Sequence, residues 1–178
     1  MTESGAVTVA RAPQPRATAV KRGMWGSGPP DVSGYGGLRR PVIRHTRAVR
    51  PYGGWFDAVA DRLLSLVPGL PEDFGEVDRD ELTLHIPRQA LVATVQALRD
   101  DPALRFEICV SCSGVHYPDE PGEELHAVYH LLSITHNRRL RLEVTCPDGD
   151  AVIPSVVKVY PMADWHERET WDMFGIEF

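Results

Sequence analysis

From residue 54 onward, the spacing of hydrophobic residues switches between the period of a helix and the period of a strand. Apolar residues three or four positions apart predict a first helix over 54–67, closed by Pro68-Gly69. A second helix is predicted to begin after Pro87 and to end at Asp100-Asp101-Pro102. The inward positions are Phe56, Val59, Leu63 and Leu66 in the first helix, and Leu91, Val95 and Leu98 in the second.

Strands are predicted where apolar and polar residues alternate. One covers 81–86 after an acidic loop over 72–80, and another covers 104–112. The strongest alternation predicts a hairpin of 124–135 and 138–146, because Asn137 tolerates the positive φ of a tight turn. The residues expected on one face of each strand are Leu82, Leu84 and Ile86; Phe106, Ile108, Val110 and Cys112; and Leu140, Leu142 and Val144, the last three alternating with Arg139, Arg141 and Glu143.

The end of the chain is predicted to be helical. Pro154 opens a short helix that reaches Tyr160, and Pro161 separates it from a last helix that starts near Asp164. The resulting order α-β-α-β-β-β-α-α indicates an α+β fold, with a mixed or antiparallel sheet of about four strands and helices packed on one side.

Residues 1–52 form a different kind of segment from residues 53–178. Gly and Pro are frequent in this N-terminal arm and apolar periodicity is nearly absent, so it cannot bury enough surface to order itself. Trp25 and Tyr35 stand among glycines and are candidate anchors that dock the arm on a neighbouring protein. A disordered, basic, solubilising tail is the alternative interpretation, and the sequence leaves both open.

Charge is divided unevenly along the chain. Residues 1–50 hold nine Lys or Arg against two acids, residues 51–178 hold ten against twenty-three, and the net charge is −6. The acidic body argues against nucleic acid as the main partner. No secretory signal and no run of about eighteen apolar residues is present, so we expect association with a membrane to come only through a partner.

Three cysteines, Cys109, Cys112 and Cys146, predict reduced thiols in a cytosolic protein. A zinc site is the main metal-binding alternative, but Cys109 and Cys112 would project to opposite faces of a regular strand. Three scattered thiolates are too few for an iron–sulfur cluster. No serine elbow or dinucleotide-binding glycine motif is found, so we expect no active site within this chain. The histidines considered as zinc ligands are His116, His126, His130 and His136.

The last helix has recognisable ends. Asp164 is a candidate N-cap, Glu167 can complete a capping box, and Gly175 provides a left-handed stop. Arg168 can pair with Asp172 across one turn, while Glu167, Trp171 and Phe174 follow at helical spacing. By physical chemistry alone, this is an ordinary capped amphipathic helix.

The order of residues 167–176, Glu-Arg-Glu-Thr-Trp-Asp-Met-Phe-Gly-Ile, resembles a family signature. It is similar to the E-R-E-x-x-D-hydrophobic-hydrophobic-G-I pattern of the 30-kDa-type subunit of the proton-pumping NADH-quinone oxidoreductase, respiratory complex I. Residues 100–117 resemble the helix-to-strand junction of that family, and residues 125–161 resemble its central hairpin and the segment after it. The resemblance covers roughly residues 55–178.

This resemblance implies a non-catalytic scaffold in the hydrophilic arm, on the cytoplasmic side of the membrane. The implied partners are the large quinone-site subunit and the small iron–sulfur subunit of complex I. The chain itself would bind no cofactor, while the whole complex uses FMN and iron–sulfur clusters. Acid–base catalysis by the signature carboxylates is disfavoured, because Arg168 between them favours their ionised forms. The residues expected at the subunit interface are Glu167, Arg168, Glu169, Trp171, Asp172, Phe174 and Gly175.

Two departures from the family pattern and three alternatives stay open. His116 stands where family members usually carry an acid, and the basic, proline-rich segment that usually follows the signature is not seen after Phe178. The absence of this segment indicates either a truncated or split protein, or a lineage that has lost the contact which the segment makes with the large subunit.

Three functional alternatives stay open. They are the equivalent subunit of a membrane-bound hydrogenase or of a ferredoxin- or deazaflavin-fed dehydrogenase, a free-standing interaction module, and a small zinc hydrolase.

Overall fold

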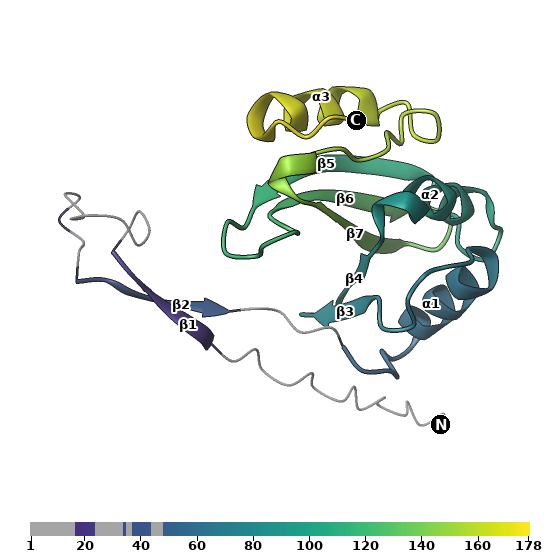
Figure 1. Cartoon of the computed structure of the whole chain (residues 1–178). Helices are drawn as coiled ribbons and strands as arrows, with labels where there is room; N and C mark the ends of the chain where they lie inside the picture. The colour runs from purple at the N-terminus through teal and green to yellow at the C-terminus, as the bar shows by residue number, and fades with distance from the viewer. Residues whose placement is uncertain (1–16, 24–33, 35–36, 44–47) are drawn as a thin grey trace. The chain divides into compact units, whose positions relative to one another are not determined.

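The computed structural model describes residues 17–23, 34, 37–43 and 48–178, and the chain divides into two units, 1–46 and 47–178 (Figure 1). The candidate anchors Trp25 and Tyr35 lie outside the described residues. The first unit contains a two-stranded antiparallel sheet, β1 (Ala17–Arg22) and β2 (Arg39–Ile43). We predicted an irregular arm without strands. No local signal indicates this pairing, since its register sets Lys21 opposite Arg40 and Arg22 opposite Arg39, and like charges disfavour a ladder.

The second unit is built on a five-stranded sheet in the order β3-β4-β7-β6-β5 (Figure 1). The pair β4–β7 is parallel and the other neighbours are antiparallel, so the predicted α+β fold with a mixed sheet is confirmed. The fifth strand is β3, which we had assigned to the acidic loop. The strand bounds are β3 Gly75–Asp78, β4 Glu81–His85, β5 Ile108–His116, β6 Leu125–Ser133 and β7 Arg138–Cys146.

Helices cover one face of this sheet, as predicted. Alternate strand residues, such as Leu84, Tyr129 and Leu142, are fully buried and form one core with the apolar faces of the helices. The bounds are α1 Trp55–Leu66, the 3-10 turn η1 Arg88–Ala90, α2 Leu91–Asp100, the 3-10 turn η2 Asp148–Asp150 and α3 Ala163–Phe174. The helix predicted over 154–160 is instead a single turn, in which the Tyr160 N–H donates to the Val156 carbonyl at 2.8 Å.

A β-bulge in β5 corrects two predictions about this strand. Its register with β6 shifts between Cys109 and Ser111, so one residue is inserted and the facing of the side chains changes. Cys109 and Cys112 are therefore both buried, although a regular strand would place them on opposite faces. Val110, which we placed on the buried face with Cys112, is half exposed.

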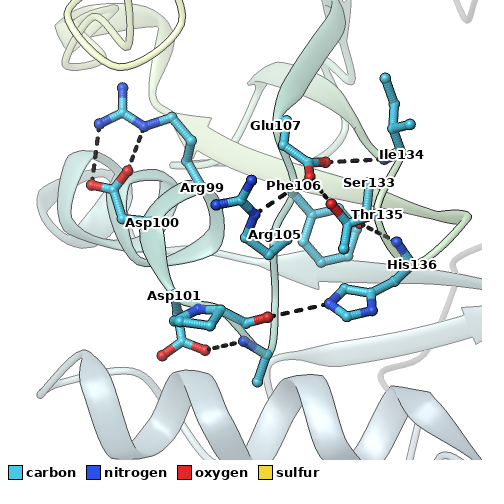
Figure 2. Close-up of polar contacts among 12 residues, drawn as sticks. Arg99, Asp100, Asp101, Arg105, Phe106, Glu107, Ser133, Ile134, Thr135 and His136 are labelled. Atoms are coloured by element: carbon cyan, nitrogen blue, oxygen red, sulfur yellow. Dashed lines mark hydrogen bonds and ion pairs between the residues drawn. The ribbon is translucent and has the colours of Figure 1, made fainter.

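The turn between β6 and β7 is tied to the segment that joins α2 to β5 (Figure 2). The Glu107 carboxylate accepts the Ile134 N–H at 3.0 Å and a short hydrogen bond from the Thr135 hydroxyl. The His136 ring lies 3.3 Å from the Pro102 carbonyl oxygen. These contacts fix the hairpin against the segment that precedes β5.

The Glu107 contacts predict a loss of stability in acid. The hydrogen bond from Thr135 is the largest cause that lowers the pKa of Glu107, to about 2. A carboxyl group with a depressed pKa stabilises the fold above its unfolded pKa, and this contribution is lost as the pH falls towards about 2. We therefore expect Glu107→Gln to be less stable than the wild type at pH 6 and the difference to shrink below about pH 4.5. Urea unfolding at several pH values measures this. The exposed acid Glu72, changed to Gln, is the control, and an unchanged difference down to pH 2 would contradict the prediction.

Candidate subunit interface on the last helix

One stripe of α3 is buried against β5. Ala163, Glu167 and Thr170 are at most 4 % exposed and recur at helical spacing. The Thr170 hydroxyl lies 3.8 Å from the Cys112 sulfur. Further along the stripe, the Phe174 ring lies so close to Gly114 that a Cβ at this position would come within 2.2 Å of it. The missing side chain of Gly114 is what allows the end of α3 to approach the strand.

Glu167 is the polar centre of this contact. Its carboxylate accepts hydrogen bonds from the Ser155 hydroxyl at 2.6 Å, the Val156 N–H at 2.8 Å and the Tyr129 hydroxyl at 3.3 Å. The predicted capping box is wrong, because α3 begins with Met162 as its N-cap and no side chain caps it. Glu167 instead joins three segments of the chain: α3, the turn over 155–160 and strand β6.

The opposite face of α3 is exposed and combines large apolar side chains with charged ones. Four large side chains, more than half exposed, lie within or next to the helix: Met162, Trp165, Trp171 and Met173. The charged signature residues Arg168, Glu169 and Asp172 share this exposed surface. Arg168 donates from Nε to Asp164 at 3.2 Å, and its guanidinium lies 5.5 Å from the centre of the Trp165 ring. The observed ion pair therefore joins Arg168 to Asp164 rather than to the predicted Asp172.

Comparisons with known proteins show which family the chain belongs to. Residues 84–178 match the family described as the 30-kDa subunit of respiratory-chain NADH dehydrogenase. The chain belongs to this family.

Curated relatives of this family are close in sequence. Three proteins that carry the name of the NADH-quinone oxidoreductase C-subunit are 60 % identical (Streptomyces coelicolor, 89 % of this chain and 66 % of the relative), 58 % identical (Mycolicibacterium gilvum, 92 % and 75 %) and 56 % identical (Mycobacterium tuberculosis, 89 % and 70 %). The chain thus spans about two thirds to three quarters of the length of these relatives.

Two solved structures share the fold of this chain. A trypsin-resistant fragment of Nqo5 has a TM-score of 0.53 at 24 % identity, covering 70 % of this chain and 96 % of the fragment. A chain of the membrane-bound sulfane sulfur reductase, an archaeal respiratory membrane complex, has a TM-score of 0.56 at 22 % identity, covering 68 % and 69 %. At these identities the likeness concerns the fold alone.

The family signature is therefore divided between the two faces of α3. Glu167 faces inward and Phe174 is partly buried, whereas Arg168, Glu169, Trp171 and Asp172 face outward. Gly175 ends the helix in the left-handed conformation with φ 73°, as predicted, and its N–H donates to the Trp171 carbonyl at 2.8 Å. Sequence reasoning missed the partners of the buried face, Tyr129, Ser155 and Gly114, and the exposed Trp165 and Met173. The one available sign of an exposed apolar surface in the sequence was the second indole, Trp165, beside the signature.

The polar residues considered for metal binding are not brought together. Over residues 48–178, no three His, Cys, Asp or Glu side chains form a group that could hold a metal ion. His126 lies against Glu143 and His130 against Ser111. Burial raises the pKa of Cys109 to about 11 and that of Cys112 to about 12, which keeps both thiols protonated and poor as ligands. In the described part of the chain, no helix is long and apolar enough to cross a membrane.

Proposed function

We propose that this chain is a non-catalytic scaffold subunit in the hydrophilic arm of an NADH-quinone oxidoreductase, and that the outer face of α3 is its subunit interface. The proposal rests on family membership and on one structural observation. The signature helix satisfies its buried carboxylate within the chain and leaves two Trp and two Met side chains exposed beside charged residues. Large exposed apolar surfaces of this kind mark sites of protein association.

The composition of this surface fits a protein partner. Trp and Met are enriched at interfaces, where they fill pockets, and surrounding charges set the register of the partner. Trp165 has an amphipathic ring already covered on one side by the Arg168 guanidinium. Arg168 and Asp164 lie on the helix surface, so their pairing contributes little to folding by itself. Such charges are available to form stronger contacts once a partner excludes water.

The finer assignment follows the family resemblance. The partners would be the large quinone-site subunit and the small iron–sulfur subunit, with the chain held on the cytoplasmic side of the membrane. Oxidation of NADH, reduction of quinone and proton pumping would be activities of the whole complex. FMN and the iron–sulfur clusters would be bound by other subunits. The raised pKa values of Cys109 and Cys112 make these two thiols poor ligands for a cluster. The relatives at 56–60 % identity carry the NADH-quinone oxidoreductase name, which favours this function over a hydrogenase or a free-standing module.

The decisive experiment is an affinity pull-down of the tagged chain from detergent-solubilised membranes. The amount of complex that is recovered is measured, and NADH-to-quinone activity is assayed on the eluate. We expect the double variant Trp165→Ser/Trp171→Ser to lose at least about tenfold in recovered complex, because interface Trp residues commonly contribute about 2 kcal/mol or more. Arg168→Ala should reduce recovery in the same direction but less. Ile134→Ser is the matched control, because Ile134 is similarly exposed and lies on the turn between β6 and β7.

Two results would contradict the proposal. One is recovery of the wild-type chain alone, free of iron and of NADH-oxidising activity. The other is a normal yield of complex with the Trp variants or with Arg168→Ala, combined with a raised KM for quinone, which would place these residues near the substrate rather than at a structural interface.

A further inference from the structure

The face of the sheet opposite the helices carries a row of acids and histidines. The register sets His85 of β4 next to Glu143 of β7, and His126 of β6 lies against the same Glu143. The His85 ring lies 3.1 Å from Glu76 of β3. Glu76 and His126 are buried to more than nine tenths, which is unusual for charged groups on a face without helices. Part of that cover comes from the loop that joins β5 to β6.

The loop over 117–124 folds onto His126. The edge-on contact between Tyr117 and the imidazole has a centroid distance of 4.7 Å, and the Glu120 carboxylate lies 3.7 Å from Nε2. The loop keeps its own shape, because the Glu120 N–H donates to the Tyr117 carbonyl at 3.0 Å and the Tyr117 N–H donates to the Glu124 carbonyl at 2.7 Å.

The two ring nitrogens of His126 differ in their hydrogen bonding. Nδ1 lies 2.6 Å from the Glu143 carboxylate, a short contact typical of a charge-assisted hydrogen bond. Nε2 is buried and has no hydrogen bond of normal geometry, although the Glu120 carboxylate and the Glu123 backbone are close to it. In the neutral ring that donates from Nδ1, the Nε2 lone pair faces a carboxylate and repels it. In the imidazolium, Nε2 carries a proton and attracts the same carboxylate.

We propose that His126 is a protonation-dependent latch that closes the 117–124 loop onto the outer face of the sheet. The imidazolium lies between Glu143 of β7 and Glu120 of the loop, and its positive charge holds both. When His126 loses its proton, the attraction to Glu120 is lost, and the tip of the loop loses this contact with the sheet.

The charges that face His126 support this direction. Burial alone would lower the pKa of His126, but the hydrogen bond and charge of Glu143, the Glu123 backbone and the charge of Glu120 together raise it. For Glu143, burial raises the pKa and the bond to His126 lowers it, with a net lowering. A raised pKa for His126 and a lowered pKa for Glu143 are the shifts expected of an ion pair. The other groups nearby are Arg141 of β7, 3.8 Å from Glu143, His85 of β4 with Glu76 of β3, and the Tyr117 phenol, whereas β5 sets the apolar Val115 opposite His126.

The sign of the pH dependence follows from the raised pKa. A histidine whose folded pKa exceeds its unfolded value contributes its full stabilisation below about pH 6.5 and loses it as the pH rises through the folded value. Closure of the loop adds the Glu120 carboxylate beside Nε2, and loss of the His126 proton removes this attraction. The loop should therefore be more closed in mildly acidic solution than in alkaline solution.

Amide hydrogen exchange of residues 117–124 in the full chain tests the latch, with rates corrected for the intrinsic effect of pH. We expect protection at pH 6 to exceed protection at pH 8.5 by about two- to fivefold in the wild type, which is the effect of one partly exposed ion pair. His126→Gln should remove this pH dependence. His130→Gln is the matched control, since His130 lies on the same strand and face but bonds to Ser111, and it should keep the wild-type behaviour.

A second variant keeps the test decisive if His126→Gln folds poorly. Glu120→Gln removes the loop carboxylate from an exposed segment, and we expect it to weaken the pH dependence and to lower the His126 pKa measured by NMR. Equal protection at both pH values in the wild type, or an unchanged pH dependence in either variant, would overturn the proposal.

Discussion

Replacing Glu167 with Ala is expected to lower the free energy of unfolding by about 2–4 kcal/mol. The substitution leaves the Val156 N–H, the Ser155 hydroxyl and the Tyr129 hydroxyl without their shared acceptor in a site that is 4 % exposed. Because the same carboxylate joins α3 to β6, we also expect the helix to become the most easily unfolded part of the domain. Urea unfolding at pH 7 gives the loss of stability, and hydrogen exchange of residues 163–174 shows where it falls.

Two further variants isolate the role of the carboxylate. Glu167→Gln keeps the shape and one carbonyl acceptor, so it should lose about half as much as Glu167→Ala. Glu169→Ala lies two residues away on the exposed face and should change the stability by less than about 0.5 kcal/mol. Equal effects of the Ala substitutions at 167 and 169 would show that the buried network does not hold the helix.

Adding a single methyl group at Gly114 is expected to cost about 1–3 kcal/mol. The new Cβ would lie 2.2 Å from the Phe174 ring, which is far inside a van der Waals contact, so either the ring or the whole end of α3 must move. Thermal unfolding of Gly114→Ala measures the loss. Gly149→Ala is the control, since no atom lies within 4 Å of its added Cβ and its φ is not in the left-handed region.

A double-mutant cycle shows whether the Phe174 contact causes that loss. Phe174→Leu makes room at the strand, so Gly114→Ala should be less harmful in its presence than in the wild type. If the two substitutions add without coupling, the clash with Phe174 is not the cause, and the close approach of α3 to β5 has another basis.

The hydrophobic pattern predicted the parts of the fold whose signal is local. Helical periodicity placed α1 and α2, and strict alternation placed β6 and β7 with the buried Leu140, Leu142 and Val144. Strand β3 was missed because its four residues are too few to show a period, and its hairpin turn uses Arg79 and Asp80 in the left-handed conformation rather than a glycine. The bulge in β5 was missed because it depends on pairing with β6.

In the candidate site, too, the features with a local signal were predicted and the long-range contacts were not. Helical spacing and the left-handed stop at Gly175 were enough to predict the last helix and its end. The role of Glu167 could not be predicted, because its hydrogen-bond partners lie 11, 12 and 38 residues away along the chain. The capping-box rule assigned the Glu167 side chain to backbone N–H groups at the start of the helix. The fold instead brings Tyr129 and Val156 within hydrogen-bond distance of its carboxylate. That both indoles, Trp165 and Trp171, face solvent likewise depends on how α3 packs against β5.

The segment after α3 has a consequence for assembly. The Glu177 N–H donates to the Ala151 carbonyl at 2.7 Å, and the Ile153 N–H donates to the Glu177 carbonyl at 2.9 Å, so the chain is fastened again directly beyond the helix. With Glu167 bonded near its middle, α3 is already immobilised before a partner arrives. Binding at its outer face would then restrict mainly the rotation of a few Trp and Met side chains, and little backbone entropy would oppose association. An interface on this preformed helix would therefore bind more tightly than one of equal area on a segment that orders only on binding.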